Sequence, residues 1–190
     1  GRLLRAPTLF EDQLKILFTT NCTWTNTQHM SAALVDALGA RGPTGRRAFP
    51  SAAVCARKSP AWWRARIRVG YRAEACAHLS RLAAKGDDRL DPTARAEPTR
   101  DVRALRKALQ ERPGFGPYAA GQALRLLGHY DDLALDAAVR SHLSEGRSDA
   151  ELCADYTSFG AFAGLALWMD FSRRWLDHPK VPAPVRKGRR

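Results

Sequence analysis

Apolar residues recur along most of this chain with the spacing of amphipathic α-helices. In the first such stretch, Pro7 and Thr8 supply a start signal, and Leu14 and Phe18 fall on one helical face. The pattern predicts helices over 8–19, 26–38, 50–57, 60–68, 72–85, 100–110, 117–127, 136–144, 148–156 and 160–176. No alternating run has the length of a useful strand, so the expected fold class is all-α.

Two segments interrupt this helical pattern. Residues 87–99 are polar and hold two prolines, which predicts a long surface loop. The tail 181–190 has four basic residues and no acidic one, which is typical of a mobile arm.

Composition places the chain among globular proteins and adds a strong positive charge. Its 190 residues suit one domain or two small lobes, with 45% apolar and 26% charged residues. Lys and Arg exceed Asp and Glu by 31 − 19, a net charge of +12, which points to a polyanionic partner such as nucleic acid. The longest apolar run, 161–169, is far shorter than the roughly 20 residues of a membrane span. Because no secretory signal opens the chain, we expect a cytoplasmic, nucleoid-associated monomer without a membrane partner.

The four cysteines do not suggest a metal centre. The cysteines are scattered along the chain without a Cys-x-x-Cys pair, at Cys22, Cys55, Cys76 and Cys153. The five histidines are also dispersed. This spacing argues against a zinc knuckle, a tight iron–sulfur framework and a disulfide scaffold. Buried free thiols and no cofactor are therefore expected.

The segment 104–128 is the most informative part of the sequence. Two amphipathic helices are joined by a Pro-Gly-Phe-Gly turn, in which Gly114 and Gly116 can adopt positive φ and let backbone amides approach a phosphate. The second helix starts at Pro117, so its positive dipole end lies near that anion. The alternative is an ordinary helix connection with a glycine cap.

The residues after this hairpin strengthen the case for DNA. A polar corner and a short apolar stretch lead to Asp136, and the whole segment resembles the helix–hairpin–helix DNA glycosylase superfamily, which includes endonuclease III and the 3-methyladenine and 8-oxoguanine glycosylases. The turn PGFGPYAA is similar to the family hairpin, with Arg112 in place of the usual apolar residue. The resemblance implies that Asp136 is the catalytic carboxylate. Asp136 also suits a helix N-cap, and the two roles are compatible.

Further segments resemble the same superfamily in the same order: 1–24, 48–56, 69–83 and 160–175. The resemblance implies that Asn21 fills the gap left by an extruded base and that Tyr71 and Arg72 approach the DNA beside the lesion. Taken alone, Asn21 also suits a helix C-cap, and Tyr71 also suits packing.

Three departures from the family pattern limit this inference. Tyr118 stands where the bifunctional members have the lysine that forms a Schiff base, so the lyase step is expected to be missing. The four-cysteine loop of endonuclease III is absent, since only Cys153 follows Asp136. Residues near the site are small, which indicates either a roomy base pocket or close helix packing: Ala119, Ala120, Ala137 and Ala138. The expected pocket residues are Tyr118, Ala138 and Phe10.

A basic segment provides further expected DNA contacts. Residues 57–72 hold six basic residues, no acidic one and the pair Trp62-Trp63. Such a mixture suits phosphate contact beside an unstacked site, and Arg68 is placed in this surface. The alternative is a solvated amphipathic helix with buried tryptophans.

These expectations combine into one hypothesis. Residues 22–132, including the hairpin, form a central helical barrel, while 1–21 and 133–190 pair as a second lobe, with the active site in the cleft between them. The expected function is a monofunctional glycosylase that flips an alkylated purine or modified pyrimidine out of double-stranded DNA. The alternatives are a glycosylase acting on hypermodified phage bases such as glucosylated hydroxymethylcytosine, a lyase using Lys15 or Lys107, and a non-catalytic DNA-structure-binding module. A monovalent cation at the hairpin is compatible with this hypothesis, and an iron–sulfur cluster is not.

Overall fold

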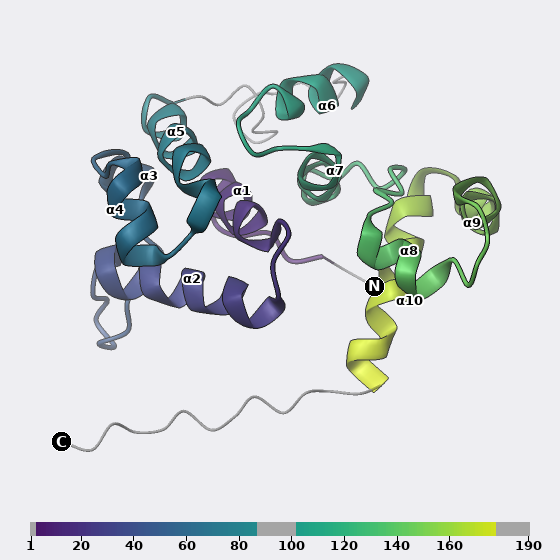
Figure 1. Ribbon diagram of the computed structural model, residues 1–190, viewed down its shortest axis with the longest axis horizontal. Helices are drawn as coiled ribbons and strands as arrows, with labels where there is room; N and C mark the ends of the chain where they lie inside the picture. Colours follow the sequence, from purple (N-terminus) through teal and green to yellow (C-terminus); the bar gives the residue numbers. More distant parts are fainter. Residues whose placement is uncertain (1–2, 87–101, 178–190) are drawn as a thin grey trace.

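The computed structural model describes residues 3–86 and 102–177, so the predicted loop 87–99 and the basic tail lie outside the described residues. The elements follow one another as α1 (Leu9–Thr19), α2 (Trp24–Leu38), α3 (Ala52–Ala56), α4 (Pro60–Trp62), η1 (Trp63–Ile67), η2 (Gly70–Arg72), α5 (Ala73–Ala84), α6 (Val102–Gln110), α7 (Pro117–Leu126), α8 (Ala137–Leu143), α9 (Asp149–Tyr156), η3 (Thr157–Phe162) and α10 (Ala163–Asp177). Helices α1 to α5 gather on one side, α8 to α10 gather on the other, and α6 and α7 lie between them (Figure 1). The described part of the chain has no strand, which confirms the all-α prediction.

Side-chain caps mark the starts of α1, α2, α4, α8 and α9. The Thr8 hydroxyl accepts the Glu11 N–H at 3.2 Å at the start of α1, and the Asp136 carboxylate accepts the Val139 N–H at 2.8 Å at the start of α8. At α9, Ser148 and Glu151 form a reciprocal capping box. These caps are encoded within a few residues, so the predicted boundaries lie within two or three residues of the observed ones.

The predicted helix 60–68 has a different form. A three-residue α4 leads into the π-helical turn η1, which ends at Arg68 with φ 62°. Trp63 and Ile67, four residues apart, are both almost fully buried. Both side chains pack against α2 and α5 from a π-helical turn, where a regular α-helix was expected. Hydrophobic periodicity alone does not predict this change of helix type.

The described residues form two hydrophobic clusters. The first contains side chains of α1, α2, η1, α5, α6 and α7, with Leu14, Leu17, Phe18 and Leu124 fully buried. The second is smaller and joins α8, α9 and α10 around Leu167. This packing differs from the expected division of the chain, because α1 belongs to the first cluster and not with 133–190. Its apolar face is covered by α2, α5 and α7, so it is an integral part of that core.

The connection between the two clusters is held tightly on both sides. A Cβ added at Gly121 of α7 would lie 2.5 Å from the Cβ of Ala134, and one added at Gly164 of α10 would overlap the Asp132 carbonyl. The Tyr130 carbonyl accepts the Gly164 N–H at 2.7 Å. The linker 128–136 is therefore wedged between α7 and α10, which fixes where Asp136 emerges.

Candidate active site

The hairpin before α7 packs against α1 and α5 of the first cluster. Gly114 has φ 83°, and a Cβ there would lie 2.8 Å from Leu17 Cδ2 and 2.9 Å from Ala75 Cβ. Arg112 donates to the buried Gln13 side-chain oxygen at 2.9 Å. Glycine at this position allows the turn to pack closely against α1 and α5. Any larger residue would have a strained backbone and a side chain that collides with these helices.

Gly116 differs from the expectation of positive φ. Its φ is −72°, which any residue adopts, and a Cβ there would meet nothing within 4 Å. It is the N-cap of α7, without a side-chain cap, and Pro117 is the first helical residue. The first turn of α7 therefore begins in open space without a side-chain acceptor of its own, an arrangement that suits an external anion.

Asp136 stands at the N-terminus of α8, where the wedged linker ends. Its backbone is extended and one carboxylate oxygen caps the helix through Val139, so the side chain has a fixed direction. Asp136 is half-buried, whereas the neighbouring Ala137 and Ala138 are exposed. Asp136 is thus a partly accessible carboxylate held in one orientation.

Two side chains of α7 lie within electrostatic reach of Asp136. The phenol of Tyr118 donates to the Thr19 hydroxyl of α1 at 3.2 Å, and its pKa is raised mainly by burial and further by the Asp136 carboxylate. Burial also lowers the pKa of Arg125 to about 10, an effect that Asp136 opposes. The helix that follows the hairpin therefore brings a neutral phenol and a buried cation toward the carboxylate.

The expected wedge residues meet at the end of α1. Asn21 has φ 43°, and its amide donates to the Tyr71 hydroxyl at 3.3 Å. Tyr71 is 62% exposed, so the ring and the exposed Asn21 stand together at the surface. Both side chains of this pair are therefore accessible to solvent.

Arg72 does not lie at this surface, contrary to the direct DNA contact that the resemblance implied. It is 7% exposed and donates to the Thr20 hydroxyl at 3.0 Å, to the Val69 carbonyl at 3.2 Å and to the Thr20 and Asn21 carbonyls. Carbonyls at a helix C-terminus have no intrahelical donor, and a guanidinium satisfies several at once. Arg72 therefore holds the loop that carries Asn21.

The other expected site residues have separate surroundings. Arg68 is exposed, as a phosphate contact requires, whereas Phe10 is 8% exposed and packs edge-to-face against Phe49 in the first core. Ala119 and Ala120 are also core residues, which supports close helix packing for these two alanines. Of the four small residues, only Ala137 and Ala138 remain at the surface beside Asp136.

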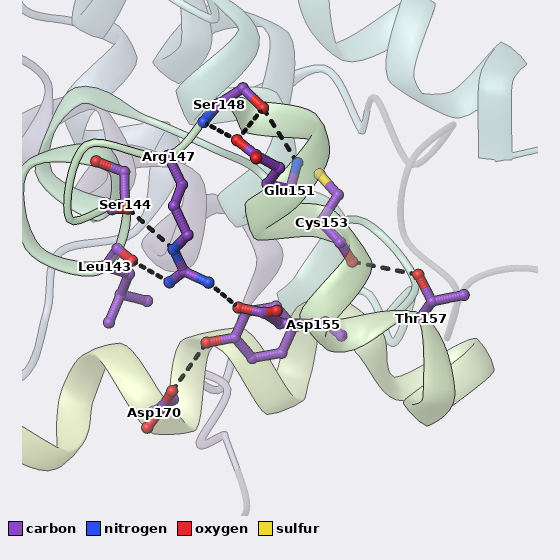
Figure 2. Close-up of polar contacts among 10 residues, drawn as sticks. Leu143, Ser144, Arg147, Ser148, Glu151, Cys153, Asp155, Thr157 and Asp170 are labelled. Atoms are coloured by element: carbon purple, nitrogen blue, oxygen red, sulfur yellow. Dashed lines mark hydrogen bonds and ion pairs between the residues drawn. The ribbon is translucent and has the colours of Figure 1, made fainter.

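The second cluster behind Asp136 is stabilised by polar contacts around the α8–α9 turn. Figure 2 shows Arg147 bonded to the Leu143 and Ser144 carbonyls and to the Asp155 carboxylate at 2.5 Å. The Tyr156 hydroxyl donates to the Asp170 carboxylate of α10 at 2.8 Å. These contacts fix α9 against α8 and α10, so they hold α8, the helix capped by Asp136, in place within the second cluster.

Several residues of this site were not among the sequence candidates. Thr19 bonds the Tyr118 hydroxyl, Arg125 bonds Gln122 further along α7, and Asp132 pairs with Arg106 at the linker. Arg125 had one available signal, since it interrupts the apolar stripe of the helix 117–127. That signal shows only that a charge lies on a buried face, and the tertiary contacts show what it meets.

Comparison with solved structures identifies this architecture. One similar structure is the 8-oxoguanine glycosylase/lyase of Clostridium acetobutylicum in complex with double-stranded DNA containing cytosine opposite 8-oxoguanine, with a TM-score of 0.70 and 17% sequence identity over 93% of this chain and 62% of that one. Another is MBOgg1 in complex with a low-affinity DNA ligand, with a TM-score of 0.73 and 18% identity over 93% of this chain and 63% of that one. A third is the 3-methyladenine DNA glycosylase of Archaeoglobus fulgidus, with a TM-score of 0.65 and 15% identity over 92% of this chain and 61% of that one. The chain has the fold of the helix–hairpin–helix DNA glycosylases.

The likeness to helix–hairpin–helix glycosylases is one of fold at low sequence identity. No protein-family model matches the sequence, and no curated protein matches it. The chain spans 61–63% of the length of the three glycosylases. Within the described residues, no group of three acidic, His or Cys side chains could hold a metal ion, and no helix has the length and apolar character to cross a membrane.

Proposed function

We propose that this protein is a DNA glycosylase that extrudes a modified base from double-stranded DNA and hydrolyses its N-glycosidic bond with Asp136. The observation that carries the proposal is the position of Asp136: it caps α8 at the end of a wedged linker and lies within electrostatic reach of Tyr118 on the helix that follows the hairpin. The helix–hairpin–helix glycosylase fold supports the same function. The net charge of +12 suits a polyanionic partner.

The first step of the proposed reaction is binding to the DNA backbone. The first turn of α7 begins at Gly116 without a side-chain cap, and a phosphate there would accept backbone N–H groups and meet the positive helix end. Arg68 and the neighbouring exposed Arg64 and Arg66 add further phosphate contacts. These contacts are independent of sequence, as a search for rare bases requires.

The second step is base extrusion. Tyr71 and Asn21 stand together at the surface, and we assign them to the space that the extruded nucleotide leaves. Unstacking costs a few kcal/mol and is least for damaged or mispaired bases, so selectivity begins before any contact with the base. Because Arg72 already fixes this loop, the wedge is ordered in the free protein.

The third step is chemical. As the C1′–N bond breaks, positive charge develops on the sugar, and a fixed carboxylate at Asp136 stabilises it and orients the attacking water. Tyr118 is a neutral phenol whose pKa burial raises, so it supplies no amine for imine formation. The proposed product is a free base and an intact abasic site.

A glycosylase assay with a matched variant tests this function. The protein is incubated with duplexes that each carry one modified base, and hot alkali then cleaves any abasic site. We expect release from at least one duplex and a loss of 10²-fold or more in Asp136→Asn, with affinity for a duplex containing a tetrahydrofuran abasic analogue unchanged or higher. Glu151→Gln, which changes an exposed carboxylate of the α9 capping box, is the control for loss of an acidic group.

The outcomes separate the alternatives. DNA binding without release from any duplex would support a non-catalytic binding module. Release in Asp136→Asn within tenfold of wild type would remove Asp136 from the catalytic role.

A further inference from the structure

Arg125 is a buried cation at the junction of the two clusters. It is 2% exposed and is one of the largest fully buried side chains of the described residues. Its guanidinium donates to the Gln122 side-chain oxygen at 3.0 Å and to the Leu133 carbonyl at 3.3 Å, and its central carbon lies 5.0 Å from the Trp168 ring centroid. One side chain thus joins α7, the linker that leads to Asp136, and α10.

The surroundings of Arg125 leave its charge only partly compensated. Among the described residues no carboxylate lies within ion-pair distance of it, and its Nε has no hydrogen-bond partner. The neighbouring Gln122 also has a buried amide nitrogen without a partner in the same part of the chain. Burial lowers the pKa of Arg125 only to about 10, so the group stays charged at neutral pH. A buried charge that is only partly compensated destabilises the fold, so its presence calls for a role other than stability.

The place of this charge relates it to the proposed reaction. Tyr118, Gln122 and Arg125 are spaced four and three residues apart on α7, so they share one face of the helix. Asp136 and Tyr118 both influence the titration of Arg125, which places the three groups within electrostatic reach of one another. A base held beside Tyr118 and Asp136 would therefore lie in the field of the Arg125 cation.

We infer that Arg125 makes this site selective for neutral modified bases, which leave as anions, and against bases that already carry a positive charge. This inference rests on the proposed function and specifies its substrate class. Arg125 is a charge-compensating and positioning residue, since it acts on the leaving base through the protein and through Gln122.

The chemistry explains the expected selectivity. When a neutral base leaves, the electron pair of the C1′–N bond goes to the base, which becomes an anion, while water adds to C1′ and its proton finally neutralises that anion. A fixed cation in a dry site lowers the energy of this charge separation. A cationic alkylpurine leaves as a neutral molecule, so the same field repels it in the bound state and gives no compensating stabilisation of the leaving group.

A comparison of neutral and cationic bases tests the inference. Single-turnover rates and dissociation constants are measured on otherwise identical duplexes that contain 7-methylguanine as the cationic base, or 8-oxoguanine, uracil, 5-hydroxymethyluracil or glucosylated 5-hydroxymethylcytosine as neutral bases. The variants are Arg125→Met and Arg125→Lys. Arg81→Gln is the control, because it removes an exposed arginine of α5 that is not part of the proposed site.

We expect wild type to release a neutral base at least tenfold faster than 7-methylguanine. Arg125→Met should lower the neutral-base rate at least tenfold with little change in the dissociation constant and without lowering the 7-methylguanine rate, and Arg125→Lys should restore part of the loss. A purely structural role would lower both rates together.

Two results would overturn the inference while leaving the glycosylase function standing. One is 7-methylguanine release as fast as that of any neutral base, and the other is a neutral-base rate in Arg125→Met within threefold of wild type. If Arg125→Met does not fold, Arg125→Gln replaces it, and the rate ratio of the wild-type protein decides by itself. Absence of release from every duplex would instead reject the proposed function.

Discussion

The guanidinium of Arg72 lies 4.5 Å from the ring centroid of Tyr71 and supports the exposed aromatic side chain from within the protein. The same guanidinium bonds the Thr20 and Asn21 carbonyls at the end of α1. One buried cation therefore organises both halves of the proposed wedge, although the two halves are 50 residues apart in sequence. Arg72 orders the residues that we expect to enter the DNA and does not enter it.

Arg72→Met should weaken both the fold and base extrusion. Loss of the guanidinium removes its hydrogen bonds to the partly buried Thr20 and Asn21 carbonyls, and a hydrogen bond to a charged group contributes about 1.5–3 kcal/mol. The free energy of unfolding is measured by urea denaturation, and extrusion is measured by the fluorescence of 2-aminopurine in a duplex.

The exposed Arg68 is the matched control for this prediction. Arg68→Met should change the free energy of unfolding by less than about 0.5 kcal/mol while weakening DNA binding and lowering its salt dependence by about one phosphate contact. Equal behaviour of the two variants in both assays would show that Arg72 acts as an ordinary surface arginine.

The two hairpin glycines should respond differently to alanine. Gly114→Ala combines a positive φ with close contacts to Leu17 and Ala75, so we expect a loss of about 1–3 kcal/mol of stability. Gly116→Ala adds a methyl group in open space at ordinary φ, so the melting temperature should stay near that of wild type. Its DNA affinity should nevertheless fall, because the added methyl group stands at the proposed phosphate position. Unchanged affinity of folded Gly116→Ala would place the phosphate elsewhere.

Borohydride trapping should distinguish Tyr118 from an amine at the same position. Wild type should form no covalent adduct with DNA in the presence of borohydride, since a phenol cannot form an imine. Tyr118→Lys places an amine beside Asp136 and should yield a trapped adduct on the duplex that wild type processes. Tyr118→Phe is the control that removes only the bond to Thr19. An adduct with wild type would redirect attention to Lys15 and Lys107.

The four free cysteines should divide into two classes of reactivity. Cys55 and Cys76 are fully buried, and burial raises the pKa of each thiol to about 12. At pH 8 the thiolate fraction of these two is about one in 10⁴, since it falls tenfold for each unit between pH and pKa. Cys22 and Cys153, which are half-buried, should react with a thiol reagent in the native protein. All four should react in denaturant, and rapid native labelling of four thiols would contradict the burial of the first core.

Local features could be predicted from the sequence because they depend on neighbouring residues. Apolar spacing and capping residues determine where a helix begins and which face is buried, so the positions of α1, α7 and α8 follow from residues a few places apart. The Pro-Gly-Phe-Gly turn and the placement of Asp136 as an N-cap belong to the same class. These features predicted the helices and the turn, and the helix–hairpin–helix glycosylase architecture was expected from the resemblance of these segments to that superfamily.

Only the tertiary structure decided which charges are buried and which helices share a core. An amphipathic stripe shows that α1 needs a partner but not that α2, α5 and α7 supply it, and this choice moved α1 out of the expected second lobe. Arg72 and Arg68 have the same side chain four residues apart, yet one meets the carbonyls at the end of α1 and the other meets solvent. Arg125 likewise becomes a buried cation because the linker and Trp168 fold over it. Burial of a charge depends on groups distant in sequence, because desolvation must be offset by whatever the folded chain brings alongside.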